Sequence, residues 1–130
     1  MRAQTLLPAI ALLAAMGGPA RAVVTEDSFL LRNTGDLVDL CTDQQTDRLY
    51  TAASNFCQGF AVGVFRVLQE EDAAHRLSHM FCVPEPMPSR NEGIVHFVEW
   101  AKADPTRLQL PPADGIATYL VQRFPCPHGR

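Results

Sequence analysis

In this 130-residue chain, the residues whose type and spacing are best suited to chemistry are the four cysteines, Cys41, Cys57, Cys82 and Cys126. An even number of cysteines in an exported chain indicates disulfides, and four cysteines allow three pairings. We favour Cys41–Cys57, which closes a short loop between two expected helices, and Cys82–Cys126, which ties the carboxyl end to the middle of the chain. The alternative is a zinc site, but the sequence lacks any Cys-x-x-Cys pair and the compartment is oxidising.

Two histidines, His75 and His79, are spaced as one turn of a helix, so both could ligate a metal from one face. A useful site needs a third ligand, and this His-x-x-x-His sequence lacks the glutamate that zinc hydrolases carry at the second position. The better interpretation of the pair is two surface or partly buried histidines that bind no metal. We therefore expect no metal site and no cofactor.

Three consecutive acids, Glu70, Glu71 and Asp72, precede the histidines. Acid–base catalysis needs two carboxylates in different environments across a cleft, whereas adjacent side chains at one helix end point in different directions. The glycines of Gly59-x-x-x-Gly63 do not form a phosphate loop, because no suitable lysine or hydroxyl residue follows them. The sequence predicts no active site, so we do not expect an enzyme.

The amino terminus has the parts of a secretory signal peptide. A positive Met1-Arg2 start precedes an apolar run over residues 6–16, and Ala20-Arg21-Ala22 is a small-x-small cleavage site. The run is shorter than the roughly 20 apolar residues of a membrane-spanning helix. We expect residues 1–22 to be a cleaved signal peptide and residues 23–130 to be one exported domain that does not insert into a membrane.

The charge of the expected mature domain limits its partners. Removal of Arg2 and Arg21 leaves nine basic and 14 acidic side chains, a net charge of about −5 with neutral histidines. Nucleic acids and anionic membrane surfaces attract basic patches. The charge balance therefore argues against both as partners.

Apolar spacing predicts an all-α domain, a small disulfide-stapled bundle of about four helices. Residues 23–32 are expected to form a docked arm or a short strand. The expected helices begin at the Asn33-Thr34-Gly35-Asp36 cap, near Asp47, at the Ser89-x-x-Glu92 capping box and at Pro111-Pro112. The second of them should end near Glu71, the third at Asp104-Pro105 and the last before Pro125.

The second expected helix carries Gly59 and Gly63 in its interior. A glycine there costs about 1 kcal/mol relative to alanine, so a pair needs a reason. Their spacing places both on one face, where missing side chains let another backbone approach. We therefore expect a neighbouring helix to pack closely against Gly59 and Gly63.

The motifs taken together resemble the Tai family of periplasmic immunity proteins, also called the Rap-type family. The likeness covers residues 35–126 and rests on Thr34-Gly35-Asp36-Leu37, Phe56-Cys57-Gln58-Gly59-Phe60 with Gly63, Phe81-Cys82-Val83-Pro84 and Phe124-Pro125-Cys126. Phe60 stands where the family commonly has tyrosine. Tyr119 stands where a small residue is usual.

The resemblance implies a periplasmic protein that neutralises a peptidoglycan amidase effector of type VI secretion by occluding its active-site groove. It also implies an all-helical, disulfide-bonded fold that is often a homodimer. The expected protrusion covers residues 69–81, where the pattern is least regular. Its charged and histidine side chains are the expected partner contacts: Glu70, Glu71, Asp72, His75, Arg76 and His79.

A second class of function fits the same composition. General periplasmic stress proteins, such as acid-activated chaperones, are also small, helical and disulfide-bonded. They expose apolar surface when their carboxylates are protonated, and the acid excess of this chain is compatible with that behaviour. Binding to a periplasmic amidase effector distinguishes the two functions.

Overall fold

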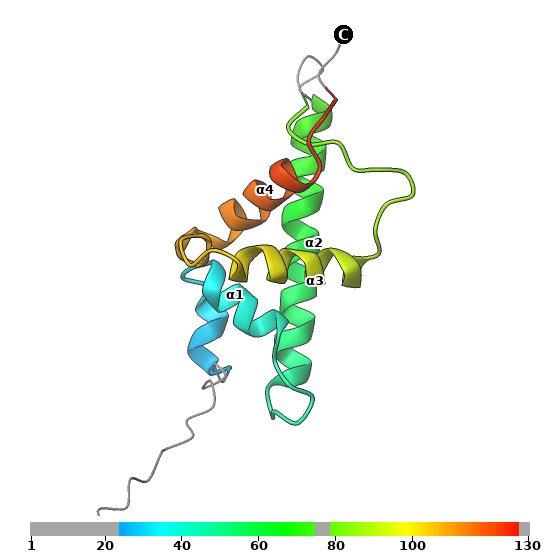
Figure 1. Cartoon of the computed structure of the whole chain (residues 1–130). Coiled ribbons are helices and arrows are strands. Elements are labelled where there is room, and N and C mark those ends of the chain that lie inside the picture. The colour runs from blue at the N-terminus through cyan, green and yellow to red at the C-terminus, as the bar shows by residue number, and fades with distance from the viewer. Residues whose placement is uncertain (1–23, 75–78, 128–130) are drawn as a thin grey trace, which may run out of the picture.

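The computed structural model describes residues 24–74 and 79–127, and every regular element in these ranges is a helix (Figure 1). The order is η1 (Glu26–Leu30), α1 (Thr34–Cys41), α2 (Tyr50–Ala74), α3 (Arg90–Lys102), η2 (Arg107–Gln109) and α4 (Pro112–Arg123). The expected all-α bundle with four main helices is confirmed. The expected signal peptide lies outside the described residues.

Helix α1 is short and lies at the centre of the fold, in contact with η1, η2 and the other three α-helices. Asn33 begins it, because its side chain accepts a hydrogen bond from Asp36 N at 3.0 Å and so satisfies a free helical N–H group. Leu37 and Leu40 are at most 1% exposed. An eight-residue helix is too short to be stable alone, so packing must hold it in place.

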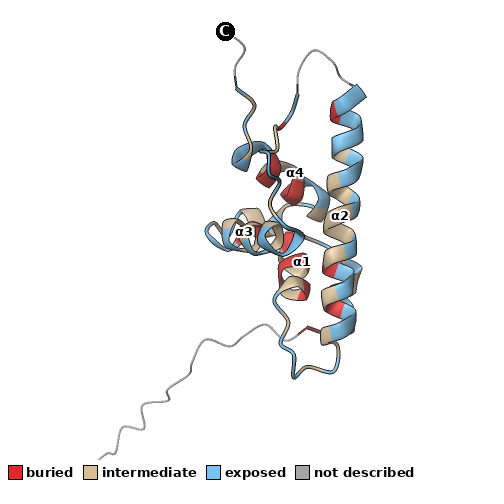
Figure 2. Ribbon diagram, turned by 90° about the vertical axis from the view of Figure 1, so that its right-hand side faces the viewer, coloured by how far each residue is buried: buried red, intermediate tan, exposed pale blue. Residues whose placement is uncertain are grey.

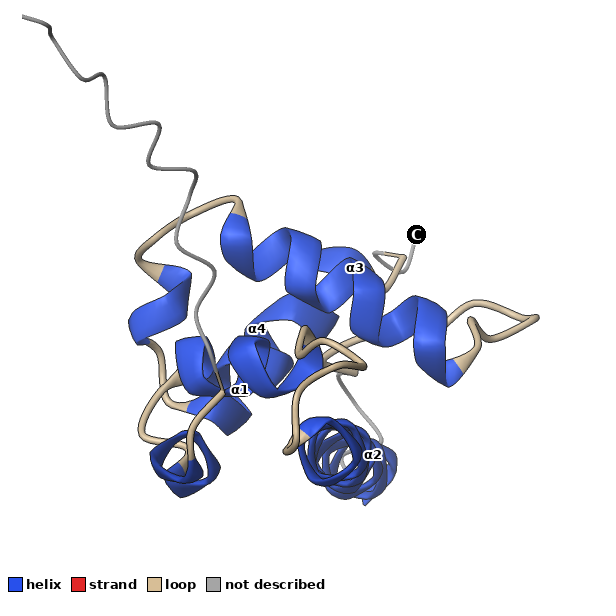
Figure 3. Ribbon diagram, turned by 90° about the horizontal axis from the view of Figure 1, so that it is seen from below, coloured by secondary structure: helices blue, strands red, loops and turns tan. Residues whose placement is uncertain are grey.

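The long helix α2 lies along one side of the bundle, and the other helices lie to one side of it (Figure 3). Its buried side includes Ala53 and Cys57, which pack with Leu40 of α1 and with Val24. The disulfide Cys41–Cys57 joins the end of α1 to α2, with a Cα–Cα distance of 5.2 Å. This is the pairing favoured from the sequence.

The amino-terminal end of α1 contacts both the chain that leads into α4 and α4 itself. Both the backbone N and the Oγ1 of Thr34 donate to Leu110 O, at 2.8 and 3.0 Å. Thr34 is fully buried against Gly115 of α4, where an added Cβ would overlap Thr34 Oγ1 and lie 3.0 Å from Thr34 Cγ2. Only glycine fits at position 115 without displacing Thr34.

The glycine pair of α2 does not have the expected role. Gly59 and Gly63 are exposed, and a Cβ built at either residue meets no atom within 4 Å. The expectation of a close helix contact at this pair is wrong within the chain, because α2 turns its opposite face to the bundle (Figure 2). The close approach occurs at Gly115 instead.

The amino-terminal segment and both ends of α2 also differ from the sequence expectations. Of the docked arm or short strand expected over residues 23–32, the strand is wrong, because the segment contains the 3₁₀ helix η1, before which Thr25 N donates to Ser28 Oγ at 3.2 Å. The segment does dock on the bundle, since Val24 and Phe29 pack with the cluster around Leu40. Helix α2 begins at Tyr50 rather than near Asp47, because the Asp47 carboxylate accepts a hydrogen bond from Leu49 N at 2.7 Å and holds a turn there. At its other end α2 continues to Ala74. Within the described ranges, no helix combines the length and apolarity needed to cross a bilayer.

Alanine substitutions compare Gly115, which lies in a close contact between helices, with Gly59, which lies at an open position on a helix surface. We expect Gly115→Ala to lower the free energy of unfolding by about 1–3 kcal/mol, because the methyl group overpacks a buried contact. Gly59→Ala should raise it by about 0.5–1 kcal/mol, because alanine is the better helix former and the site is open. Urea denaturation of the oxidised protein measures both. Equal effects of the two substitutions would contradict the assigned contact.

Candidate functional site

The last turns of α2 extend beyond the other helices, and residues 79–89 form an irregular segment that runs back to α3 (Figure 1). We call residues 70–74 the α2 end and residues 83–88 the proline loop. These two stretches, together with residues 79–82, form the candidate site. It overlaps the protrusion predicted from the sequence but extends further toward α3.

Asp72 anchors the chain that follows the α2 end. It is 9% exposed, and its carboxylate accepts hydrogen bonds from Met80 N and, at 2.8 Å, from His79 Nδ1. Charge-assisted hydrogen bonds of this kind are the stronger ones in proteins. The expectation that Asp72 is a surface contact for a partner is therefore wrong, because its carboxylate is occupied within the fold.

The other predicted contacts divide into two groups. Glu70, Glu71 and His79 are exposed, and His79 Nδ1 lies 2.8 Å from Asp72 Oδ2. His75 and Arg76 lie outside the described residues. The exposed members remain predicted partner contacts.

The second disulfide fixes the chain between the α2 end and the proline loop. Cys82 is bonded to Cys126, as favoured from the sequence, and Cys82 N donates to Phe124 O at 2.7 Å. Next to it, Phe81 is 5% exposed and its ring lies 6.1 Å from that of Phe65. This position is thus held by a covalent bond, a hydrogen bond and core packing.

The proline loop is exposed between two fixed ends. Its far end is the capping box of α3, in which Ser89 N donates to Glu92 Oε2 at 2.8 Å and Glu92 N donates to Ser89 Oγ at 3.3 Å. The hydrogen bonds from Ser89 also hold the pKa of the Glu92 carboxyl below its ordinary value. Between these ends Met87 is 50% exposed, and Met80 just before the loop is 45% exposed.

The sequence predictions missed the proline loop as part of the site. A usable signal was present, because Pro84, Pro86 and Pro88 lie between a disulfide cysteine and a capping box. Proline restricts the backbone, so such a segment is stiff although it is not helical. A stiff, exposed, partly apolar loop is suited to protein binding.

The chemistry of the site is that of a binding surface. Over the described ranges, no three metal-ligating side chains come together. The surface combines the carboxylates of Glu70 and Glu71 with the exposed apolar side chains of Met80 and Met87. A surface of this kind is complementary to a partner surface that has an apolar region and a basic patch.

The family of Rap1a immunity proteins matches the chain over residues 33–126. The chain belongs to this family. No curated protein and no solved structure gives a significant match. The Rap1a match begins at the residue that caps α1 and ends at the last cysteine, so it includes all four α-helices and both disulfides. Membership in an immunity family implies that the protein binds a cognate effector.

The anchoring role of Asp72 can be tested against its exposed neighbour. We expect Asp72→Ala to lower the free energy of unfolding by about 1–3 kcal/mol, because Met80 N–H loses its buried acceptor. Hydrogen exchange at the Met80 amide should accelerate at the same time. Glu70→Ala is the matched control and should change neither quantity. Unchanged exchange at Met80 in Asp72→Ala would contradict the assigned anchor.

Proposed function

We propose that this Rap1a family member is a periplasmic immunity protein of the Tai type. It binds a peptidoglycan amidase effector of type VI secretion and blocks the effector's active-site groove with the candidate site. The observation that carries the proposal is the family match, which covers the whole helical bundle. The amidase as target and type VI secretion as the delivery route come from the sequence resemblance.

The proposed location has two lines of support. The first 22 residues have the pattern of a signal peptide, and an effector that attacks peptidoglycan must be met in the periplasm. The structure has two disulfides, which form and persist in oxidising compartments such as the periplasm. Both features suit a protein that meets its target outside the cytoplasm.

The shape of the candidate site supports the proposed mode of inhibition. A protrusion can enter a catalytic groove at low entropic cost if it is already ordered before binding. The proline loop meets this condition, because Cys82 and the Ser89–Glu92 capping box fix its two ends. Glu85, which is exposed on the loop, adds a third negative charge to the candidate site, besides those of Glu70 and Glu71. We therefore expect the effector surface around the groove to be basic.

Neutralisation in cells tests the proposal. An amidase effector from the producing strain, directed to the periplasm, should lyse cells, and co-expression of this protein should restore growth. The oxidised protein should also form an isolable complex with that effector. Undiminished lysis together with the absence of a complex would refute the proposed amidase target.

Two exposed apolar residues offer a matched pair of variants for locating the interface. Met80 beside the proline loop is 45% exposed, and Val95 on α3 is 53% exposed. We expect Met80→Asp to weaken effector binding at least about tenfold, because a charge would be buried in the interface. Val95→Asp should leave the dissociation constant within about twofold. Titration calorimetry measures both, and the reverse order of effects would place the interface on α3.

The homodimer implied by the resemblance also has a candidate surface. The exposed face of α2 carries Phe56 and Val67, which are 37% and 60% exposed, on either side of Gly59 and Gly63. Two such faces could approach closely at the glycines. We propose this face for the dimer. Sedimentation velocity should show a dimer for the unmodified protein and a monomer for Val67→Glu, and an unchanged dimer would exclude this face.

A further inference from the structure

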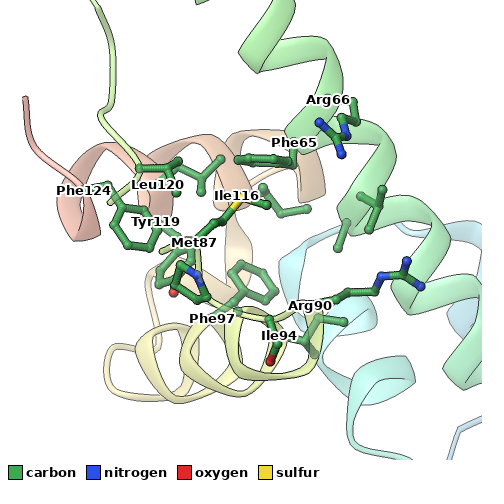
Figure 4. A pocket seen from close by; sticks show the side chains of 16 residues that line it. Phe65, Arg66, Met87, Arg90, Ile94, Phe97, Ile116, Tyr119, Leu120 and Phe124 are labelled. Atoms are coloured by element: carbon green, nitrogen blue, oxygen red, sulfur yellow. The ribbon is translucent and has the colours of Figure 1, made fainter. Parts of the chain in front are cut away.

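A cavity of about 280 Å³ lies where α2, α3 and α4 meet beneath the proline loop (Figure 4). Its wall is largely apolar, and its main contributors are Phe65, Phe97, Ile116, Leu120 and Phe124. Met87 and Pro88 of the loop line it as well. Since a water takes up about 30 Å³ of liquid volume, the cavity has room for roughly nine heavy atoms.

A glycine in α3 helps to leave this space open. Gly93 lines the cavity, and a Cβ built there meets no atom within 4 Å. Glycine in a helix interior costs about 1 kcal/mol relative to alanine, and no close packing in the described chain requires glycine at this position. Its effect on the structure is to enlarge the cavity.

The charges at the cavity are all of one sign. Arg66 and Arg90 line it, and no carboxylate does. Figure 4 shows both arginines on the side of the cavity next to α2. Among residues 24–74 and 79–127 neither forms an ion pair. Arg66 Nη1 donates to Gln69 Oε1 at 2.9 Å, and Arg90 Nη1 donates to Gln58 Oε1 at 3.3 Å.

These hydrogen bonds leave donors available at the cavity. A guanidinium group has five N–H donors, so each arginine retains several after its bond to glutamine. Guanidinium groups pair well with carboxylates. An apolar cavity bordered by two cations that lack carboxylate partners is therefore complementary to a molecule with an aliphatic body and an anionic end.

We infer that the cavity binds an aliphatic monocarboxylate of about eight to ten carbons, a medium-chain fatty acid. The alkyl chain lies among the aromatic and aliphatic side chains, and the carboxylate lies at the rim, where Arg66 or Arg90 donates hydrogen bonds to it. The inference does not rest on the proposed function. It adds a small-molecule site beneath the loop that we propose as an effector contact.

The two isoleucines after the signal segment provide direct probes of this site. Ile94 and Ile116 are the isoleucines of residues 23–130, and both line the cavity. We expect decanoate, added to residues 23–130 with labelled isoleucine methyl groups, to shift both methyl signals. Titration calorimetry should show octanoate binding about 15-fold more weakly, because it buries two fewer methylene groups. Decanol and decylammonium should both bind more weakly than decanoate.

Variants test the two parts of the site separately. The double variant Arg66→Gln, Arg90→Gln should weaken decanoate binding about fivefold or more, because exposed charge pairs contribute modestly, and should leave decanol within about twofold. Gly93→Leu should abolish binding of both by filling the cavity. Arg48→Gln, remote from the cavity, is the matched control and should have no effect.

Three results would overturn the inference. Decanoate that leaves both isoleucine signals unmoved would show that the cavity takes no aliphatic acid, as expected for a groove that receives only a protein side chain. Decanol or decylammonium that binds as tightly as decanoate would show that the arginines confer no preference for an anion. Decanoate binding that Gly93→Leu leaves unchanged would place the site elsewhere.

Discussion

The contact between α1 and α4 at Thr34 and Gly115 is the constraint on which the rest of the structure depends. Helix α1 has eight residues and is too short to be stable by itself. At its first turn Thr34 donates twice to Leu110 O and packs against the bare backbone of Gly115. At its last residue the Cys41–Cys57 disulfide fixes it to α2. Because both ends are held, the leucines of α1 can form the centre of the core.

This arrangement divides the molecule into a scaffold and a projecting end. The first disulfide and the α1 contacts stabilise the end of the bundle where α2 begins, whereas the second disulfide and Asp72 order the chain beyond the end of α2. The two disulfides thus serve different purposes. In a domain of this size, cross-links that constrain the unfolded chain contribute a large share of the stability.

Features that depend on residues close together in the sequence could be predicted, whereas features that depend on contacts between distant parts of the chain could not. The caps at Asn33 and Ser89 are made by side chains within three residues, so the starts of α1 and α3 could be read directly. The spacing of Gly59 and Gly63 showed that they share a face but not which face α2 buries. Asp72 resembled its exposed neighbours in sequence, whereas its carboxylate accepts hydrogen bonds from His79 and Met80, which follow it by seven and eight residues.

The central claim is that the α2 end and the proline loop form the surface that binds the effector. Hydrogen exchange of the protein, free and bound to a peptidoglycan amidase effector, tests this claim most directly. The account predicts slower exchange on binding in peptides that include residues 70–74 and 80–89, with little change in η1 and α1. Protection confined to η1 and α1, or no protection anywhere, would contradict it.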